Sequence, residues 1–266
     1  MVREQTFEKL YKLKLHGIAQ ALEEQIRNPD MAALGFEERV AMLVDAQWIW
    51  RENRAVTIRL RRAKLKHVAA SMEDINYRHS RQLDRAQMRS LADCEWVRQH
   101  QNITITGAAG LGKTWLCCAL QQKACREGFS ARYFAAPKFF RQLAIAYADG
   151  SFDKFLSQLA RVDVLAIDDW GLTPLGDMER RHLLEVLDDR YESRSTILTS
   201  QFTVDDWHAL IGNPTLGDAI MERILSHNHK IQLKGETMRP VERTGGGKPA
   251  SQRKGLSKPS SGEEES

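Results

Sequence analysis

Apolar positions along the first part of the chain recur at helical spacing. Two stripes, each with members three or four residues apart, predict amphipathic helices, and Asn28-Pro29 is expected to end the first of them. The first stripe comprises Phe7, Tyr11, Leu15, Ile18, Leu22 and Ile26, and the second, which begins near Phe36, comprises Val40, Leu43, Val44 and Trp48. A third, arginine-rich helix is predicted over residues 53–66. Residues 1–66 are therefore expected to form a small all-helical domain.

The pattern changes near residue 101 to short apolar runs that alternate with amphipathic segments. Strands are predicted at 102–106, 131–135, 162–167, 195–200 and 230–235, with helices at 114–127, 138–147, 152–159, 179–191, 204–211 and 218–227. The run 162–167 is almost purely apolar, as expected of a strand buried on both faces. Strands that alternate with helices predict an α/β fold with a parallel sheet covered on both sides.

These patterns divide the chain into four parts. The helical domain at 1–66 is followed by a linker at 67–100, which leads into the α/β core at 101–240. Residues 241–266 are rich in Gly, Ser, Lys and Pro and contain almost no large apolar side chain. Such a composition cannot bury enough apolar surface to fold, so a disordered tail is predicted.

Composition indicates an ordinary globular protein. Hydrophobic residues make up 42% of the 266 positions and charged residues 28%. No apolar run approaches the roughly 20 residues of a membrane span, and the first apolar residues are interrupted by charges, unlike a secretory signal. Three of the four cysteines lie in the segment 114–127 without CxxC spacing, so we expect free thiols in a reducing compartment, the cytoplasm.

Positive charge is concentrated in one segment of the chain. The net charge is +4, but residues 51–100 hold 12 basic and 6 acidic residues (+6), densest at RLRRAKLKH (59–67). A clustered basic stripe is typical of proteins that bind a phosphate-rich partner, so the helical domain at 1–66 is expected to bind DNA or a partner. The candidate DNA-binding residues are Arg59, Arg61, Arg62, Lys64 and Lys66. A solvated helix face explains a charge run equally well.

The stretch GAAGLGKT follows a predicted strand and precedes a predicted helix. It matches the whole phosphate-binding loop pattern, GxxxxGK[ST], in the context that this motif requires. Its glycines let successive backbone N–H groups turn inward around an anion, and the following helix directs its positive end to the same place. Lys113 is expected to reach the β- and γ-phosphates and Thr114 to ligate Mg²⁺. The candidate ATP-binding residues are Gly107, Ala108, Ala109, Gly110, Leu111, Gly112, Lys113, Thr114 and Trp115.

Two carboxylates close the apolar strand at 162–167. Asp168 is expected to hold the Mg²⁺ ion through water, and Asp169 to orient and polarise the water that attacks the γ-phosphate. Carboxylates at the end of a buried strand are costly unless a cation or solvent meets them. Together with the glycine loop, the two carboxylates predict a site that binds ATP and Mg²⁺ and hydrolyses the ATP to ADP and phosphate.

Taken together, the motifs resemble a known family. GAAGLGKT, VLAIDDWG, STILTSQ, DAIMERIL and KGETMR follow a helical segment in this order. The ordered set is similar to the IstB-type transposition helper ATPases, members of the AAA+ class related to the DnaC-type helicase loaders, over about residues 5–240. The resemblance implies an AAA+ P-loop fold, a three-layer αβα arrangement with a parallel central sheet, behind the helical domain.

The same resemblance implies roles for residues that their chemistry alone does not single out. Ser200 or Gln201 stands where the class carries its sensor 1 residue, and Arg223 matches an arginine finger that acts on the neighbouring subunit's γ-phosphate. Arg239 resembles a sensor 2 arginine that binds ATP. Asp169 stands where much of the class carries Glu, so slow or partner-stimulated hydrolysis is expected.

The partners that the resemblance implies are duplex DNA, an integrase-type transposase and further copies of this chain, in a ring or spiral around the DNA. The expected function is that of an ATP-dependent transposition helper, which assembles on target DNA and recruits or stimulates the transposase. Two alternatives stay open at this point: a DnaC-like helicase loader, and a DNA-binding adaptor that is switched by ATP without hydrolysing it.

Overall fold

A computed structural model describes residues 2–78 and 81–238 of the chain. Its centre is a parallel five-stranded sheet in the order β2-β3-β4-β1-β5. The strands are β1 (Asn102–Thr106), β2 (Ala131–Ala135), β3 (Val164–Trp170), β4 (Ser195–Ser200) and β5 (Asn228–Gln232). The sheet and its connecting helices confirm the predicted α/β fold, and all five predicted strands are present.

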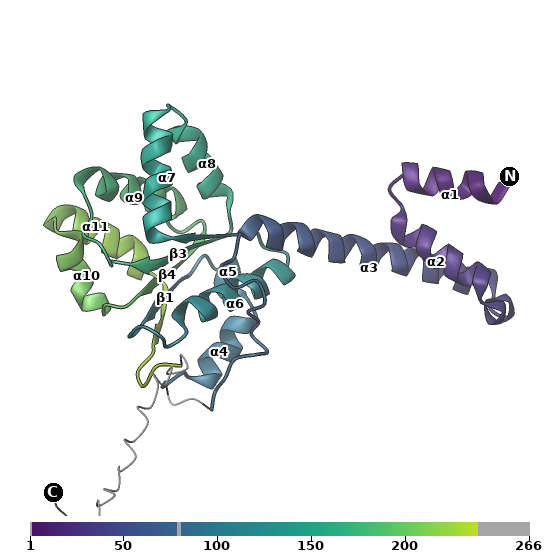
Figure 1. Cartoon of the computed structure of the whole chain (residues 1–266), viewed down its shortest axis with the longest axis horizontal. Helices are drawn as coiled ribbons and strands as arrows, with labels where there is room; N and C mark the ends of the chain where they lie inside the picture. The colour runs from purple at the N-terminus through teal and green to yellow at the C-terminus, as the bar shows by residue number, and fades with distance from the viewer. Residues whose placement is uncertain (1, 79–80, 239–266) are drawn as a thin grey trace, which may run out of the picture.

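Helices cover both faces of this sheet (Figure 1). One face carries α4 (Arg85–Ala92), α5 (Glu95–Arg98) and α6 (Lys113–Arg126). The other face carries α7 (Ala136–Ala148), α8 (Phe152–Arg161), α9 (Asp177–Arg190), α10 (Val204–Ile211) and α11 (Pro214–Leu225). The alternation of side chains along β3 separates the two cores, because Val164 and Ala166 face the first and Leu165 and Ile167 the second. Both faces of β3 are therefore shielded from water, which explains the unbroken run of apolar residues in this strand.

The N-terminal helices extend away from the sheet. The 28-residue helix α3 (Phe36–Ala63) is about 42 Å long at 1.5 Å per residue, and it carries α1 (Val2–Lys12) and α2 (His16–Arg27) at its far end (Figure 1). The short 3₁₀ helix η1 (Pro29–Ala33) follows α2, and the side chain of Asn28 accepts a hydrogen bond from the backbone N–H of Asp30. The predicted stop at Asn28-Pro29 is thus confirmed.

Two helix boundaries in this region differ from the sequence prediction. The predicted first helix is broken between α1 and α2, where Lys14 has a φ of +59°. The break lets α2 lie close against α3: a Cβ on Gly17 would come within 2.6 Å of the carbonyl oxygen of Ala46. The second and third predicted helices are a single helix, because no glycine or proline interrupts residues 36–63. That helix ends at Lys64, whose φ is +53°.

Much of the apolar side of α3 remains in contact with solvent. Phe36 is 80% exposed, Trp48 69% and Val44 56%. Because α2 packs against α3 around Gln47, Leu43 of the apolar stripe is half-buried, whereas Val44 and Trp48 stay exposed in the described chain.

The segment that the sequence assigns to a linker, 67–100, packs into the first core. Ala70, Met72 and Ile75 are buried there, followed by Met88 and Leu91 on α4. Trp96 on α5 is 2% exposed, and its indole N–H donates to the carbonyl of Leu91 at 3.1 Å. This segment therefore contributes to the core around α6.

All four cysteines are buried and free. Burial raises the pKa of the Cys94 and Cys125 thiols to about 11, so both stay protonated near neutral pH. They behave as small apolar side chains, as the sequence predicted. In the described parts of the chain, 2–78 and 81–238, no helix combines the length and apolar character that crossing a membrane requires.

Candidate nucleotide site

The glycine loop joins the end of β1 to the start of α6. Gly107, Gly110 and Gly112 have φ values of +144°, +85° and +82°, a region of backbone conformation that favours glycine. The loop also lies close to the chain beyond β5, because a Cβ on Gly107 would come within 2.4 Å of the carbonyl oxygen of Leu233. The backbone N–H of Met238 donates to the carbonyl of Gly110 at 2.9 Å. Strand, loop and helix thus follow one another as a phosphate-binding loop requires.

Lys113 lies inside the curve of this loop. Its side chain is 5% exposed, and its ammonium group donates to the carbonyls of Gly107 at 2.7 Å and Ala108 at 2.9 Å. The charge is therefore held where the loop's own backbone surrounds it. A phosphate that entered the loop would meet this ammonium group together with the N-terminal end of α6.

Asp168 is the most enclosed carboxylate of the site, with no exposed surface. The hydroxyl of Thr114 donates to it at 2.9 Å and that of Tyr133 at 2.6 Å, and the hydroxyl of Thr199 is hydrogen-bonded to its other oxygen. Burial and the bond to Asp168 raise the pKa of Tyr133, so its hydroxyl stays protonated and donates. Thr114 and Asp168 are thus brought together across two elements, as the metal-binding prediction requires.

Asp169 occupies an irregular position at the end of β3. Its φ is +60°, and the pairing of β3 with β4 shifts register between Ile167 and Trp170. The backbone N–H of Asp169 donates to the hydroxyl of Thr199 at 3.0 Å. A β-bulge redirects a side chain, and strained non-glycine backbone of this kind clusters at functional sites.

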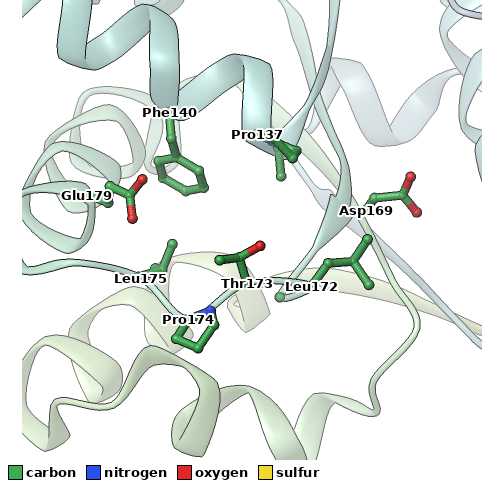
Figure 2. Close-up of a pocket in the computed structure, with 10 residues that line it drawn as sticks. Pro137, Phe140, Asp169, Leu172, Thr173, Pro174, Leu175 and Glu179 are labelled. Atoms are coloured by element: carbon green, nitrogen blue, oxygen red, sulfur yellow. The ribbon is translucent and has the colours of Figure 1, made fainter.

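A small hollow of about 170 Å³ lies on one side of Asp169. Figure 2 shows Asp169 at its edge, with the carboxylate turned away from Phe140 and Glu179. On its other side, Asp169 lines the larger hollow around the glycine loop. Its carboxylate is thus directed away from the apolar walls of the smaller hollow.

The larger hollow measures about 560 Å³, within the usual size of a small-molecule site. Its lining residues are Lys66, His67, Ala109, Gly110, Gly112, Lys113, Thr114, Trp115, Asp169, Gln201 and Met238. The loop and Lys113 fit a polyphosphate, and the buried Asp168 carboxylate beside the Thr114 hydroxyl fits a hard cation with oxygen ligands. The residues present therefore fit Mg²⁺ and a nucleoside triphosphate.

Of the two sensor candidates, Gln201 and Ser200, only the first lines this hollow. Ser200 is fully buried and donates to the carbonyl of Trp170 at 2.8 Å, which holds the ends of β3 and β4 together. Thr199, which sequence reasoning missed, lies between the carboxylate of Asp168 and the backbone N–H of Asp169. The available signal was its place at the end of the predicted strand 195–200, directly before the sensor candidates Ser200 and Gln201.

Arg223 lies away from the site in its own chain. Its side chain pairs with Asp188 on α9 and with Glu222 at 3.2 Å. The backbone carbonyl of Arg223 accepts a hydrogen bond from Asn102, at the start of β1, whereas the glycine loop follows the end of β1. The bond to Asp188 raises the pKa of this guanidinium group, which stays charged. Within one chain, the structure does not bring Arg223 to the nucleotide hollow.

The five basic residues of the predicted DNA-binding segment occupy different positions. Arg61, Arg62 and Lys64 are exposed. Arg59 donates to the carbonyl of Cys125 at 2.9 Å, at the end of α6. Lys66 reaches the nucleotide hollow, 3.9 Å from a carboxylate oxygen of Asp168. Arg239, the candidate sensor 2 residue, and the tail at 241–266 lie outside the described residues.

Arg81 contacts the backbone of the glycine loop. The sequence did not predict this role. Arg81 is 2% exposed, and its guanidinium group donates to the carbonyl of Leu111 at 2.8 Å. Burial lowers its pKa. The segment at 67–100 thus contributes to the site as well as to the core, which no motif in it indicated.

The fold and the site define an ATP-binding protein of the AAA+ P-loop class. The parallel sheet resembles that of the DnaC helicase loader, with a TM-score of 0.53 and 21% identity over 62% of this chain and 97% of that one. It also resembles DnaI, with a TM-score of 0.54 and 22% identity over 62% of this chain and 92% of that one.

The chain belongs to the family of IstB-like ATP binding proteins, whose model matches residues 8–245. It is 44% identical to an insertion sequence ATP-binding protein of Sinorhizobium fredii over 91% of this chain and 99% of that protein. It is 47% identical to an ATP-binding protein of the insertion sequence IS1162 of Pseudomonas fluorescens over 76% of this chain and 87% of that protein.

Proposed function

We propose that this chain is an ATP-dependent DNA-binding transposition helper, which assembles on target DNA, recruits or stimulates an integrase-type transposase and hydrolyses ATP to ADP and phosphate. The observation that carries the ATPase assignment is the contact between Thr114, at the start of α6, and Asp168, on β3, at 2.9 Å. Asp169 stands directly beside it on a strained bulge. Relatives named as insertion sequence ATP-binding proteins support the link to transposition.

The chemistry assigns one task to each side chain. Lys113 and the loop N–H groups hold the phosphates, and Thr114 and Asp168 would hold Mg²⁺, which supplies charge neutralisation at the transferred phosphoryl group. Asp169 orients the attacking water and accepts its proton. Gln201, at the end of β4, lines the same hollow and is the better placed of the two sensor candidates.

The position of Arg223 supports an oligomer. Within one chain Arg223 lies beside the start of β1, so an arginine finger role requires the nucleotide site of a neighbouring copy. The pairing with Asp188 keeps the guanidinium group charged and partly exposed, at 28% of its side-chain surface. Breaking this pair would release the arginine for a γ-phosphate across the interface.

Two surfaces of α3 support the remaining partners. Arg61, Arg62 and Lys64 are exposed around its end, where a row of copies would present a positive track to the phosphates of duplex DNA. The apolar surface around Phe36, Val44 and Trp48 is of the kind that protein partners cover. We assign the first surface to DNA and the second to the transposase or a further copy of the chain.

An assembly measurement tests the proposal. With duplex DNA and Mg·ATP the chain is expected to form large complexes in analytical ultracentrifugation, and with ADP it is expected to form smaller ones. Addition of the transposase is expected to increase the rate of ATP hydrolysis. Nucleotide-independent association with DNA would contradict the proposal.

A DnaC-like helicase loader remains the second candidate, because the sheet resembles that of DnaC and DnaI. The likeness covers 62% of this chain in each case. Pull-down of a replicative helicase in place of a transposase would favour this alternative.

A further inference from the structure

Lys66 lies beside the metal-binding carboxylate of the nucleotide site. Its ammonium nitrogen is 3.9 Å from Oδ2 of Asp168. The Lys66 side chain is 50% exposed, whereas that of Asp168 has no exposed surface. One end of this ion pair is therefore open to solvent and the other is fixed in the protein.

The chain around Lys66 is anchored on both sides. Ala63, at the end of α3, and Leu65 are buried in the first core. The backbone of Lys66 and His67 lies beside the thiol of Cys118 on α6. The side chain of Lys66 extends toward β3, where it approaches Asp168, and lines the hollow beside the start of α6.

The charge of Asp168 calls for a cation. A carboxylate without exposed surface is costly unless it is paired, and the side chains that hydrogen-bond to Asp168 in the described part of the chain are the neutral hydroxyls of Thr114, Tyr133 and Thr199. Lys66 contributes a positive charge at the side of the carboxylate that also faces Thr114 and Tyr133, since all three approach Oδ2. At 3.9 Å the pair is too long for a direct hydrogen bond, so Lys66 is held to Asp168 by charge alone.

We propose that Lys66 is the counter-charge of Asp168 in the metal-free site, and that Mg²⁺ must displace it when Mg·ATP binds. Lys66 is then a positioning residue, which acts through Asp168. The inference rests on the proposed ATPase function. It also connects the metal site to α3, since Lys66 follows the end of that helix by three residues.

The test is a Mg²⁺ titration of nucleotide binding by the full chain, followed with a fluorescent ATP analogue at fixed concentration. Lys66→Gln is expected to lower the half-saturating Mg²⁺ concentration about three- to fivefold, the range of a partly exposed ion pair. Lys66→Arg keeps the charge and is expected to need as much Mg²⁺ as the wild type. Lys138→Gln is the matched control, because exposed Lys138 shares a neighbouring hollow with Lys66 but has no described contact with Asp168.

The outcomes separate this inference from the ATPase proposal. An unchanged Mg²⁺ midpoint in Lys66→Gln, or a higher one, overturns the role of Lys66 while nucleotide binding by the wild type leaves the ATPase proposal standing. Loss of nucleotide binding at saturating Mg²⁺ in Lys66→Gln would instead make Lys66 a phosphate ligand and also overturn the inference. If the wild type itself binds no nucleotide, both proposals fail.

Discussion

The hydroxyl of Thr199 on β4 donates a hydrogen bond to the carboxylate of Asp168 on β3. The same hydroxyl accepts the backbone N–H of Asp169 at 3.0 Å. The bulge in β3 sets these two aspartates against one residue of β4, because regular pairing stops at Ile167 and resumes at Trp170. A single side chain thus orients the metal-side carboxylate and the backbone of the proposed catalytic one.

Thr199→Val is expected to lower the rate constant of ATP hydrolysis at least about tenfold while nucleotide affinity changes little. Loss of a hydrogen bond to a charged group costs about 1.5–3 kcal/mol, and about 1.4 kcal/mol corresponds to tenfold in rate. Steady-state kinetics separate kcat from KM. Thr199→Ser keeps the hydroxyl and is expected to restore most of the rate; equal loss in both variants would assign Thr199 to packing alone.

Lys113→Ala is expected to abolish productive ATP binding and leave the fold intact. The ammonium group of Lys113 is the positive side chain of the loop and lies against the carbonyls of Gly107 and Ala108. Its loss removes charge-assisted bonds to phosphate, so affinity is expected to fall at least about tenfold. Isothermal titration with ATP measures this, with circular dichroism as the check on folding. Near wild-type affinity would contradict the phosphate-loop assignment.

Substitutions of Asp168 and Asp169 are expected to have different effects on nucleotide binding and hydrolysis. Asp169→Asn is expected to bind ATP yet not hydrolyse it, which traps the assembly on DNA, because the water-orienting base is lost. Asp168→Asn is expected to weaken Mg²⁺-dependent binding, since Thr114 then lacks its charged partner in the metal site. Nucleotide binding with and without Mg²⁺, measured beside single-turnover hydrolysis, distinguishes the two. Identical defects would remove this division of tasks.

The exposed basic residues are expected to carry the affinity for DNA. Arg61, Arg62 and Lys64 are exposed, so their joint replacement by Gln is expected to weaken duplex binding and leave ATP binding intact. Because three fewer positive charges then neutralise DNA phosphates, the slope of log affinity against log salt is expected to fall by about three. Fluorescence anisotropy at several salt concentrations gives this slope. Arg59→Gln is expected to affect DNA less, since Arg59 is hydrogen-bonded to the end of α6.

Arg223→Ala is expected to bind ATP normally and to lose hydrolysis by about 10³-fold or more, the range of an arginine finger. Mixing with Asp169→Asn is expected to restore part of the activity, because some interfaces then join an intact Asp169 site to an intact Arg223. Subunit exchange is confirmed independently by energy transfer between labelled chains. A fully active single variant would make Arg223 a surface residue, and a dead variant that mixing never rescues would give it a role within its own chain.

Local pattern determined the elements of the core and the centre of the site. The apolar run before Asp168 is typical of a strand buried on both faces, and Gly107-x4-Gly112-Lys113-Thr114 requires glycine conformations of its own. These signals lie within a few consecutive residues, so no knowledge of the fold was needed to interpret them. The resemblance to a known family added Arg223, which no local pattern distinguishes from a surface charge.

Only the tertiary structure decided which distant residues meet. Tyr133 on β2, Thr199 on β4 and Lys66 in the turn after α3 converge on Asp168. The strand order places β2 and β4 on either side of β3, and α3 packs against β2 and α6. The break at Lys14 and the continuity of α3 could not be predicted from the hydrophobic pattern either. Periodicity shows which face of a helix is apolar, but it does not show whether the helix is interrupted. The sequence alone specifies local conformation and which functional groups the chain carries. Long-range packing decides which of the five basic residues of the segment 59–66 face solvent and which one faces a buried carboxylate.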